Sequence, residues 1–231
     1  MRPVVVIPAR GGSKRIPRKN IRSFHGVPMI QRAIDLAIAA DIGADVVVST
    51  DDEEIASLAL AAGASVPFSR PAALADDHAG TTPVVAHAVE EMELSDEVPV
   101  CCLYATVPLL RAERLRQGFE RLQAETTIEF VFAAQQFDTA PQRALRRDAD
   151  GEISPFLPEF AEQRTQDMEP LYHDAGQFYW ARAATWRAQR HPFRSRSLMV
   201  VLDRSEVCDI DTEDDWVVAE ALYSARQKSG A

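Results

Sequence analysis

Short, continuous apolar runs alternate along this chain with segments whose apolar positions recur at helical spacing. The runs predict buried strands at residues 4–9, 44–50, 98–104, 128–134, 198–202 and 207–210. The helical spacing predicts helices at residues 28–40, 52–62, 82–94, 112–124 and 213–227. Continuous β-branched runs separated by helices are typical of parallel strands that are covered on both faces. The pattern therefore predicts the α/β class, with a doubly wound, mainly parallel sheet.

Residues 136–172 interrupt this alternation. The stretch combines many charges and only short apolar patches with several prolines, namely Pro141, Pro155, Pro158 and Pro170. It could form a flap, a small hairpin layer or a contact between two copies of the chain. No repeat, low-complexity tract or linker separates it from its neighbours. We therefore expect one domain over residues 1–231, with an inserted region at about 136–172.

The composition narrows the class of protein. Apolar residues make up 46% of the 231 residues and charged residues 26%, which suits a globular chain with a full core and argues against disorder. The net charge of −10 argues against general binding to nucleic acid or to a membrane surface. No apolar run reaches the ~18 residues of a membrane span, and the three cysteines lack zinc-binding spacing. We expect a cytoplasmic protein without a nucleic-acid or membrane partner.

Positive charge in this acidic chain is concentrated in the loop after the first predicted strand. Five of the 25 Lys and Arg residues lie between positions 10 and 19. Ligands of open α/β sheets bind beyond the carboxyl ends of the strands, where this loop must lie. Gly11 and Gly12 let backbone amides approach a ligand, and the cations suit a nucleotide triphosphate. The loop differs from a Walker A sequence, because Lys14 follows Gly12 by two residues and Pro17 prevents a helix from starting; a solvated basic loop is the alternative.

Two carboxylates, Asp209 and Asp211, stand at the end of the last predicted strand. Alternate residues of a strand point to the same face, so we expect both carboxylates to project together while Ile210 faces the other way. Two carboxylates, completed by phosphate oxygens and waters, are typical of a Mg²⁺ site. Alternatively, Thr212 caps the next helix and the acidic residues after it belong to the first turn. That alternative does not require Asp209.

Other polar segments carry weaker signals. Residues 70–81 combine Arg, paired Asp, Gly and Thr, which suits a nucleotide or sugar site but equally an ordinary polar loop. Residues 164–179 place polar groups beside aromatic ones, as sugar sites do, although a surface turn next to core aromatics explains them nearly as well. His87 lies in an apolar helical stretch and is expected to be structural. The spacing offers no Ser–His–Asp or Cys–His arrangement, so phosphoryl or nucleotidyl transfer is favoured over covalent catalysis.

Several motifs, in order along the chain, resemble the signatures of the CMP-sialic acid synthetase (acylneuraminate cytidylyltransferase) family. They are PARGGSKRIPRKN at 8–20, VVVSTDDEEIA at 46–56, SRPAALADD at 69–77 and DIDTEDDW at 209–216. Within that family, LYATVP at 103–108 and YHDAGQFYW at 172–180 are most similar to the branch that activates pseudaminic acid. The resemblance implies a nucleotidyltransferase of the nucleotide-diphospho-sugar transferase fold, with a small inserted dimerisation region. It implies a reaction of CTP with a nine-carbon 2-keto acid sugar, with Mg²⁺ as cofactor.

The same resemblance assigns roles to individual residues. It implies that the nucleotide is held by Ala9, Arg10, Gly11, Gly12, Ser13, Lys14, Asn20, Arg70, Asp77 and Thr81. It implies that the sugar contacts Tyr104, Thr106, Arg143, Arg164, Gln166, Asp174, Gln177 and Tyr179. It makes Asp209 and Asp211 the metal ligands, and it makes these two and Arg10 and Lys14 the catalytic residues. It also implies a homodimer, for which composition gives no indication.

Three alternatives stay open at this point. The acid sugar could be Neu5Ac, legionaminic acid or KDO in place of pseudaminic acid. A glycosyltransferase that consumes a nucleotide sugar can also use paired acids on a similar fold, although the long cationic loop suits a triphosphate better. A non-catalytic nucleotide sensor would need the loop but not both Asp209 and Asp211.

Overall fold

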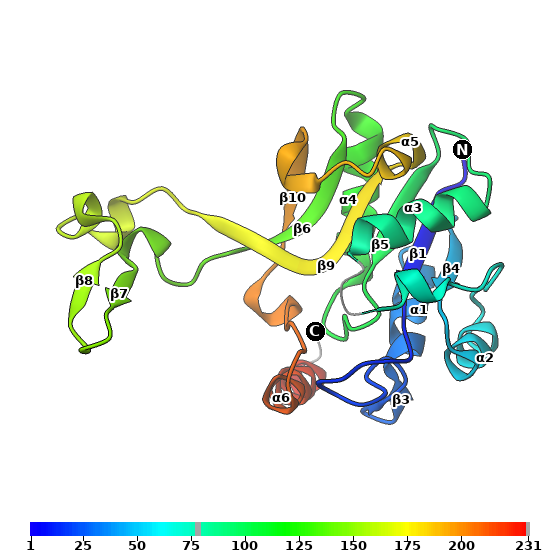
Figure 1. Ribbon diagram of the computed structural model, residues 1–231, viewed down its shortest axis with the longest axis horizontal. Helices are drawn as coiled ribbons and strands as arrows, with labels where there is room; N and C mark the ends of the chain where they lie inside the picture. Colours follow the sequence, from blue (N-terminus) through cyan, green and yellow to red (C-terminus); the bar gives the residue numbers. More distant parts are fainter. Residues whose placement is uncertain (77–79, 230–231) are drawn as a thin grey trace.

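A six-stranded sheet runs through the body of the molecule, in the strand order β10-β6-β9-β5-β1-β4. The computed structural model describes residues 1–76 and 80–229 (Figure 1). The strands are β1 Val4–Pro8, β4 Asp45–Ser49, β5 Pro99–Leu103, β6 Phe130–Gln136, β9 Tyr172–Arg182 and β10 Ser197–Val201. β1 is parallel to β4 and β5, and β6 is parallel to β10, whereas β9 runs antiparallel between β5 and β6. The predicted α/β class, with its mainly parallel sheet, is confirmed.

Helices cover both faces of the sheet. The longer ones are α1 Met29–Ala39, α2 Glu53–Ala61, α3 Thr81–Glu91, α4 Ala112–Ala124 and α6 Glu213–Ser229, and the short α5 is Ala183–Arg187. Because alternate strand residues face opposite sides, Val5 packs with α1, α2 and α4, and Val6 packs with α3 and α5. This two-sided burial explains why the strands have continuous apolar runs. No helix in the described part of the chain is long and apolar enough to cross a membrane.

A third apolar cluster connects α6 with the first loop of the chain. Trp216 of α6 packs against Phe24 of the small β2–β3 hairpin, whose strands are Ser23–Phe24 and Val27–Pro28. Ile16 and Ile210, both fully buried, belong to the same cluster. Ile16 lies within the cationic loop and Ile210 lies between the two candidate carboxylates. One apolar cluster therefore holds both chemically interesting loops against the same helix.

Residues 137–171, which we call the arm, project away from the body between β6 and β9 (Figure 1). The arm contains the hairpin of β7 Leu145–Arg147 and β8 Ile153–Pro155. Short 3-10 turns complete it, namely η2 Pro141–Arg143, η3 Pro158–Phe160 and η4 Thr165–Asp167. The body has three more such turns, η1 Ala72–Leu74, η5 Pro192–Arg194 and η6 Arg204–Glu206. The stretch therefore contains a small hairpin, one of the three expectations for it.

The strand predicted at residues 207–210 is wrong. The chain has no regular structure between η6 and α6, and no residue there pairs with the sheet. Cys208 and Ile210 pack in the α6 cluster, whereas Val207 packs against the main core beside the sheet. Burial without strand pairing therefore explains the apolar pattern. The helices predicted in the first 135 residues, and the α6 helix, lie within three residues of their expected bounds.

Candidate active site

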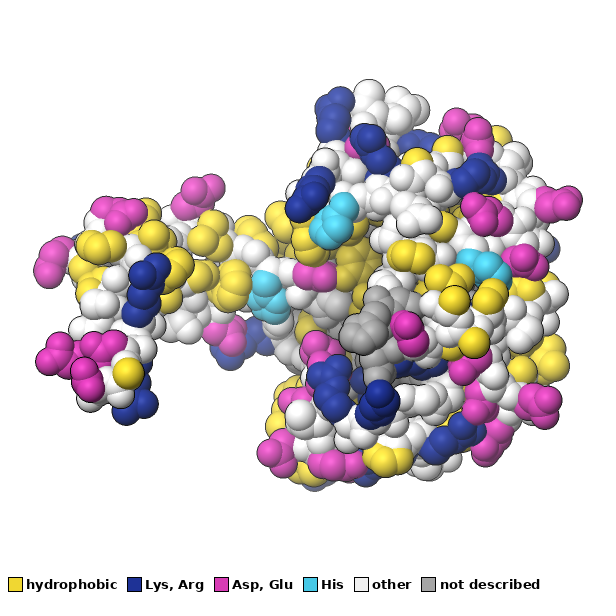
Figure 2. All heavy atoms as spheres, viewed as in Figure 1, with side chains coloured by type: hydrophobic (Ala, Val, Ile, Leu, Met, Phe, Trp, Pro, Cys, Tyr) yellow, Lys and Arg dark blue, Asp and Glu magenta, His cyan; other side chains and the backbone are white. Residues whose placement is uncertain are grey.

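A cavity of about 480 Å³ lies at the carboxyl ends of β1 and β5. We call it the central cavity. Its lining residues are Pro8, Arg10, Ser13, Lys14, Arg15, Lys19, Asn20, Arg70, Leu74, Asp76, Thr81, Val84, Tyr104, Ala105 and Thr106. In the view of Figure 2, Lys and Arg side chains lie on both the upper and the lower part of the body. A cavity at this edge of a parallel sheet, lined by several cations, is suited to a polyanionic ligand.

The central cavity brings together most of the residues expected at the nucleotide. The expected residues that line it are Arg10, Ser13, Lys14, Asn20, Arg70 and Thr81, together with Tyr104 and Thr106 from the sugar set. Ala9 is fully buried, and Gly11 and Gly12 lie outside the lining. Asp77 lies outside the described residues. Sequence reasoning did not place Arg15, Lys19 and Asp76 in the site, although the charge of the loop and the paired acids were the signals that pointed to them.

Asn20 ties the two ends of the cationic loop together. Its side-chain Nδ2 donates a hydrogen bond to the Arg10 carbonyl oxygen at 2.9 Å, and its own carbonyl accepts from the Ile30 backbone N–H at 2.7 Å. Asn20 is nearly buried, so these bonds are shielded from water. Ile16 anchors the middle of the loop in the α6 cluster. The loop is therefore held in one shape at both ends and at its centre.

Arg70 places a buried positive charge on the cavity wall. The residue is only 6% exposed, and burial lowers the pKa of its guanidinium to about 10, so it stays protonated at neutral pH. Its Nε donates to the Ser49 hydroxyl at 3.2 Å, and its Nη2 donates to the Ser49 carbonyl. Both acceptors are neutral oxygens, and the nearby Asp51 carboxylate partly balances the positive charge of Arg70. An anionic ligand in the cavity would offset the cost of burying that charge.

A buried chain of hydroxyl groups starts at the central cavity. Thr81, at the start of α3, shares a hydrogen bond of 2.8 Å with the Tyr104 hydroxyl. The Tyr179 hydroxyl donates to the Asp174 carboxylate, and the rings of Tyr104 and Tyr179 lie 5.8 Å apart, centroid to centroid. Burial raises the pKa of Tyr104 to about 12 and raises the pKa of Tyr179 further. Both phenols therefore stay neutral. The Tyr179 hydroxyl gives its proton to the Asp174 carboxylate in a hydrogen bond, so its oxygen is left to accept a hydrogen bond from a ligand hydroxyl.

Two other cavities meet the central one at Tyr104. One, of about 280 Å³, is lined partly by Thr81, Asp174 and Tyr179. The other, of about 500 Å³, contains Asp174, Tyr179 and Asp209. The expected sugar residue Gln177 is buried, and its side-chain Nε2 donates to the Ala175 carbonyl oxygen at 3.0 Å. It therefore shapes the backbone of β9 and does not line these cavities.

The two candidate carboxylates lie on a loop, so the alternation expected of a strand does not apply to them. They nevertheless influence each other: partial burial first, and then the nearby charge of Asp211, raises the pKa of Asp209. Asp211 is ion-paired with Arg15 at 2.7 Å and with Lys19 at 3.5 Å. Thr212 caps α6 as the alternative interpretation expects: its hydroxyl accepts from the Asp215 N–H at 3.2 Å. The helix-cap interpretation of this acidic segment is therefore confirmed, and the metal-site interpretation stays a prediction.

This acidic loop is suited to a hard divalent cation. Carboxylate oxygens are the ligands that Mg²⁺ prefers, and Mg²⁺ is commonly held by one or two carboxylates plus phosphate oxygens and waters. Within residues 1–76 and 80–229, no group of three or more His, Cys, Asp or Glu side chains is arranged as a metal site. Asp209 and Asp211 would therefore hold Mg²⁺ only together with oxygens from a ligand and water. Binding there would also weaken the ion pairs of Asp211 with the cationic loop.

The remaining sugar candidates lie on the arm. Arg143, Arg164 and Gln166 are all exposed and do not line the three cavities of the body. Arg143 donates to the Thr165 hydroxyl at 3.4 Å, and Arg164 pairs with Asp167 at 3.6 Å. A separate hollow on the arm contains Arg143 and Thr165. Within one chain, the expected sugar-binding residues of the arm therefore lie apart from those beside the central cavity.

Comparisons with known proteins agree with this geometry. Residues 4–207 match the family model described as "Cytidylyltransferase". A "Pseudaminic acid cytidylyltransferase" of Campylobacter jejuni subsp. jejuni is 42% identical over 99% of both chains. A "CMP-N,N'-diacetyllegionaminic acid synthase" of Legionella pneumophila is 31% identical, again over 99% of both chains. Among solved structures, a CMP:2-keto-3-deoxy-manno-octonic acid synthetase complexed with CTP has a TM-score of 0.73 at 18% identity, over 98% of this chain and 100% of that one, which shows the shared fold.

Proposed function

The chain belongs to the cytidylyltransferase family, and on that premise we propose that it transfers CMP from CTP to pseudaminic acid and releases diphosphate. The central cavity carries the proposal, because cations from one loop and the buried Arg70 face a common space at the sheet edge. The similarity to the Campylobacter enzyme, at 42% identity over the full length, supports pseudaminic acid as the sugar. The sequence-based expectation of a cytoplasmic enzyme is kept as part of this proposal.

We assign the triphosphate to the cationic side of the central cavity. Arg10, Ser13 and Lys14 would contact the phosphates, and Arg70 and Thr81 would contact the nucleoside. Arg15 and Lys19 line the same space and join this set. Several fixed cations stabilise the negative charge that accumulates on the diphosphate leaving group.

The reaction we propose is an in-line substitution at the α-phosphorus. The anomeric hydroxyl oxygen of the sugar forms the new phosphorus–oxygen bond, and the bond to the β-phosphate oxygen breaks with its electron pair leaving on diphosphate. The hydroxyl proton passes to solvent. Asp209 and Asp211 would hold Mg²⁺, which when bound neutralises phosphate charge beside the attacking group. The residues of the chain act mainly by fixing the two substrates and by preorganised charge.

On the sugar side, we propose that a second copy of the chain completes the site. Tyr104, Asp174 and Tyr179 offer hydrogen bonds next to the central cavity, whereas Arg143 and Arg164 lie on the projecting arm (Figure 1). In a homodimer, the arm of one copy would place its two arginines near the body of the other. Guanidinium groups are suited to the carboxylate of an acid sugar, because their paired donors match its geometry.

The test is diphosphate release with Mg²⁺ and CTP, using pseudaminic acid, Neu5Ac, legionaminic acid and KDO in parallel. ATP, GTP and UTP serve as nucleotide controls. We expect release with CTP and pseudaminic acid above all other pairs. Release with another acid sugar would keep the reaction and change the substrate, whereas nucleotide binding without release from any pair would favour a sensor. Release of a nucleoside phosphate from a nucleotide sugar would favour a glycosyltransferase.

A further inference from the structure

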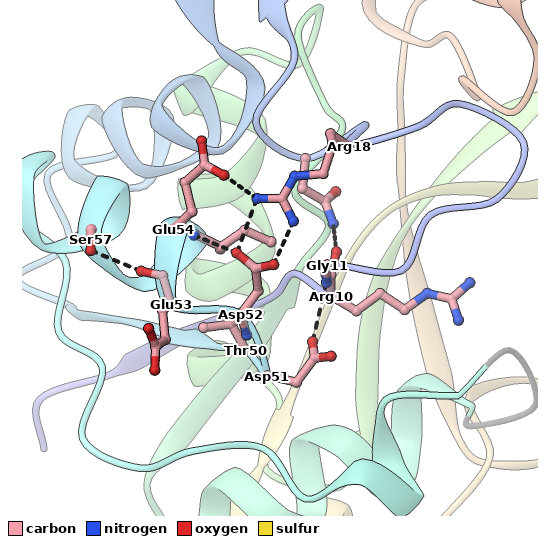
Figure 3. A network of polar contacts seen from close by, with 11 residues as sticks. Arg10, Gly11, Arg18, Thr50, Asp51, Asp52, Glu53, Glu54 and Ser57 are labelled. Atoms are coloured by element: carbon pink, nitrogen blue, oxygen red, sulfur yellow. Dashed lines mark hydrogen bonds and ion pairs between the residues drawn. The ribbon is translucent and has the colours of Figure 1, made fainter.

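The cationic loop is attached to the N-terminal end of α2 by a charged clamp (Figure 3). The Arg18 guanidinium donates to both carboxylate oxygens of Asp52, at 2.5 and 3.2 Å, and to Glu54 at 2.5 Å. Arg18 comes from the loop, and the two acids come from the start of α2. A planar guanidinium that bridges two carboxylates fixes both distance and orientation. This contact therefore restrains the loop relative to the body.

Asp52 can receive Arg18 because it is itself fixed. Its carboxylate caps α2 by accepting from the Ile55 backbone N–H at 2.9 Å, and it is largely shielded from solvent. The hydrogen bond from Arg18 is the main cause of its lowered pKa, so Asp52 stays ionised at neutral pH. An anchor that is already ordered by its helix costs no further ordering when the loop attaches to it.

The N-terminal end of the cationic loop contacts the residue next to Asp52. The Gly11 backbone N–H donates to the Asp51 carboxylate at 3.2 Å. A Cβ atom at Gly11 would lie 2.4 Å from Asp52 Oδ2, so a side chain there would collide with the anchor. The absence of a side chain at Gly11 thus allows the close approach. Residues at both ends of the loop therefore contact one short segment, Asp51–Asp52.

Arg18 differs in position from the other cations of the loop. Arg10, Lys14, Arg15 and Lys19 line the central cavity, whereas Arg18 does not. In Figure 3 the Arg10 side chain extends away from Asp52, while the Arg18 guanidinium faces Asp52 and Glu54. Arg18 also has a positive φ of 57°, a conformation that non-glycine residues adopt at some energetic cost. The hydrogen bonds to the two carboxylates offset the cost of this backbone conformation, so they stabilise the shape of the loop.

We propose that Arg18 is a positioning residue, which holds the cationic loop through Asp52 and Glu54 in the shape that receives a triphosphate. Its own charge is neutralised by the clamp, so it contributes preorganisation in place of a direct phosphate contact. The inference rests on the proposed function for the identity of the nucleotide. It concerns the phosphate part of the ligand, and for that reason inorganic tripolyphosphate can probe it separately.

The experiment compares Arg18→Ala, Arg18→Lys and Glu54→Gln with the control Arg2→Ala. Arg2 forms an exposed ion pair with Asp45 at the opposite end of the β1 strand. Calorimetric titration measures the binding of CTP and of tripolyphosphate, and steady-state kinetics measures KM for CTP and for the acid sugar. We expect Arg18→Ala to weaken binding of both phosphate ligands about ten-fold, because the loop must then be ordered on binding. KM for the acid sugar and the unfolding midpoint should be unchanged.

The compact lysine ammonium lacks the planar fork with which the guanidinium spans both carboxylates, so Arg18→Lys should give an intermediate loss. Glu54→Gln should also give a small loss, and adding it to Arg18→Ala should cost nothing further, since the clamp is already gone. Unchanged affinity for both phosphate ligands in Arg18→Ala would overturn the proposal. A ten-fold loss of phosphate-ligand affinity in the control Arg2→Ala, equal to that in Arg18→Ala, would also overturn it. If the wild type binds tripolyphosphate but not CTP, the proposed function fails while Arg18 is still tested.

Discussion

The strands of the body bury their side chains, whereas the strands of the arm expose theirs. Every residue of β5 is buried, as are the first four residues of β1, whereas all residues of β7 and β8 are exposed. The arm nevertheless carries large apolar side chains, with Leu145 60% and Ile153 67% exposed. Figure 2 shows apolar side chains gathered on the arm, which stands clear of the body. An isolated two-stranded hairpin is marginally stable in water, so the arm would gain more from the proposed partner copy than the body would.

This difference divides the chemistry of the proposed reaction. The cations and hydroxyl groups that suit the nucleotide all belong to the body and meet in one cavity. The arginines that suit the acid sugar belong to the arm, which a single chain leaves apart from that cavity. Nucleotide binding should therefore be a property of one chain, and turnover a property of two. Substitutions in the body and matched substitutions in the arm test this division.

Removing a buried charge from the body should have the largest effect. Glu206 is fully buried, accepts from Arg114 Nε at 3.0 Å and lies 3.3 Å from Arg111. Glu206→Ala leaves both arginines without this partner and should lower the free energy of unfolding by about 3–5 kcal/mol, as broken buried ion pairs do. Urea unfolding at fixed protein concentration measures the loss.

The matched control in the arm is Glu159→Ala, since Glu159 is exposed. Substitution of such a surface residue should stay within about 0.5 kcal/mol. Similar losses for both variants would contradict the view that only the body is stabilised by buried contacts. Because Glu206 directly precedes the acidic loop, the loss in the body should also be accompanied by lower activity.

The second prediction concerns catalysis within the body. Asp211→Ala should lower kcat about 100-fold, or about 2.7 kcal/mol, because it removes charge that acts beside the reacting phosphate. CTP affinity should change much less, and the arm variant Asp150→Ala should change neither. Steady-state kinetics and calorimetry give the two quantities. Equal losses in kcat and CTP affinity would count against a transition-state role.

Arg15→Ala separates two explanations of that result. Asp211 pairs with Arg15 at 2.7 Å, so its loss also releases a cation of the central cavity. If Asp211 acts through the metal, Arg15→Ala should raise KM for CTP without a comparable loss of kcat. If Asp211 acts only by holding Arg15, the two variants should have the same kinetics.

Most strands and helices of the body could be predicted from the sequence, because continuous apolar runs mark strands that are buried on both faces. Runs such as Val4–Pro8 are buried on both faces, and such runs are recognisable without tertiary information. The segment at 207–210 has the same apolar character, but it is buried without pairing in the sheet, partly under α6. A local pattern cannot distinguish burial against a helix from pairing with a strand. The antiparallel direction of β9 follows from the arm, which connects the end of β6 to the start of β9 at the same edge of the sheet. Gln136 and Tyr172, at the two ends of the arm, are therefore paired.

The site was predictable where charge is clustered in sequence and not where contacts are long-range. The cationic loop and residues 209–211 stand out in the sequence itself. The clamp between Arg18 and Asp52 joins residues 34 positions apart, and no spacing rule links them. Gln177 was expected at the sugar because it lies among polar neighbours, yet its side chain is turned into the backbone of its own strand.

The smallest effect is expected at the arm surface. Ile153→Asp places a charge on the exposed apolar face of the arm. It should leave the body folded while it separates the two copies of the proposed dimer. Activity at low protein concentration should fall about ten-fold, or about 1.4 kcal/mol, because each site then lacks the arm of its partner. Analytical ultracentrifugation measures the assembly, and diphosphate release measures the activity.

The matched control is Ile38→Asp, because Ile38 of α1 is 53% exposed on the body and Ile153 is 67% exposed on the arm. Ile38→Asp should alter neither assembly nor rate. Mixing two inactive variants makes the test independent of stability: Asp211→Ala has a defective body, and Arg164→Ala has a defective arm. If the arm acts on the partner, mixed dimers contain one site with both parts intact, and activity returns. If mixing restores nothing while mixed dimers form, the arm serves its own chain and the division drawn here is wrong.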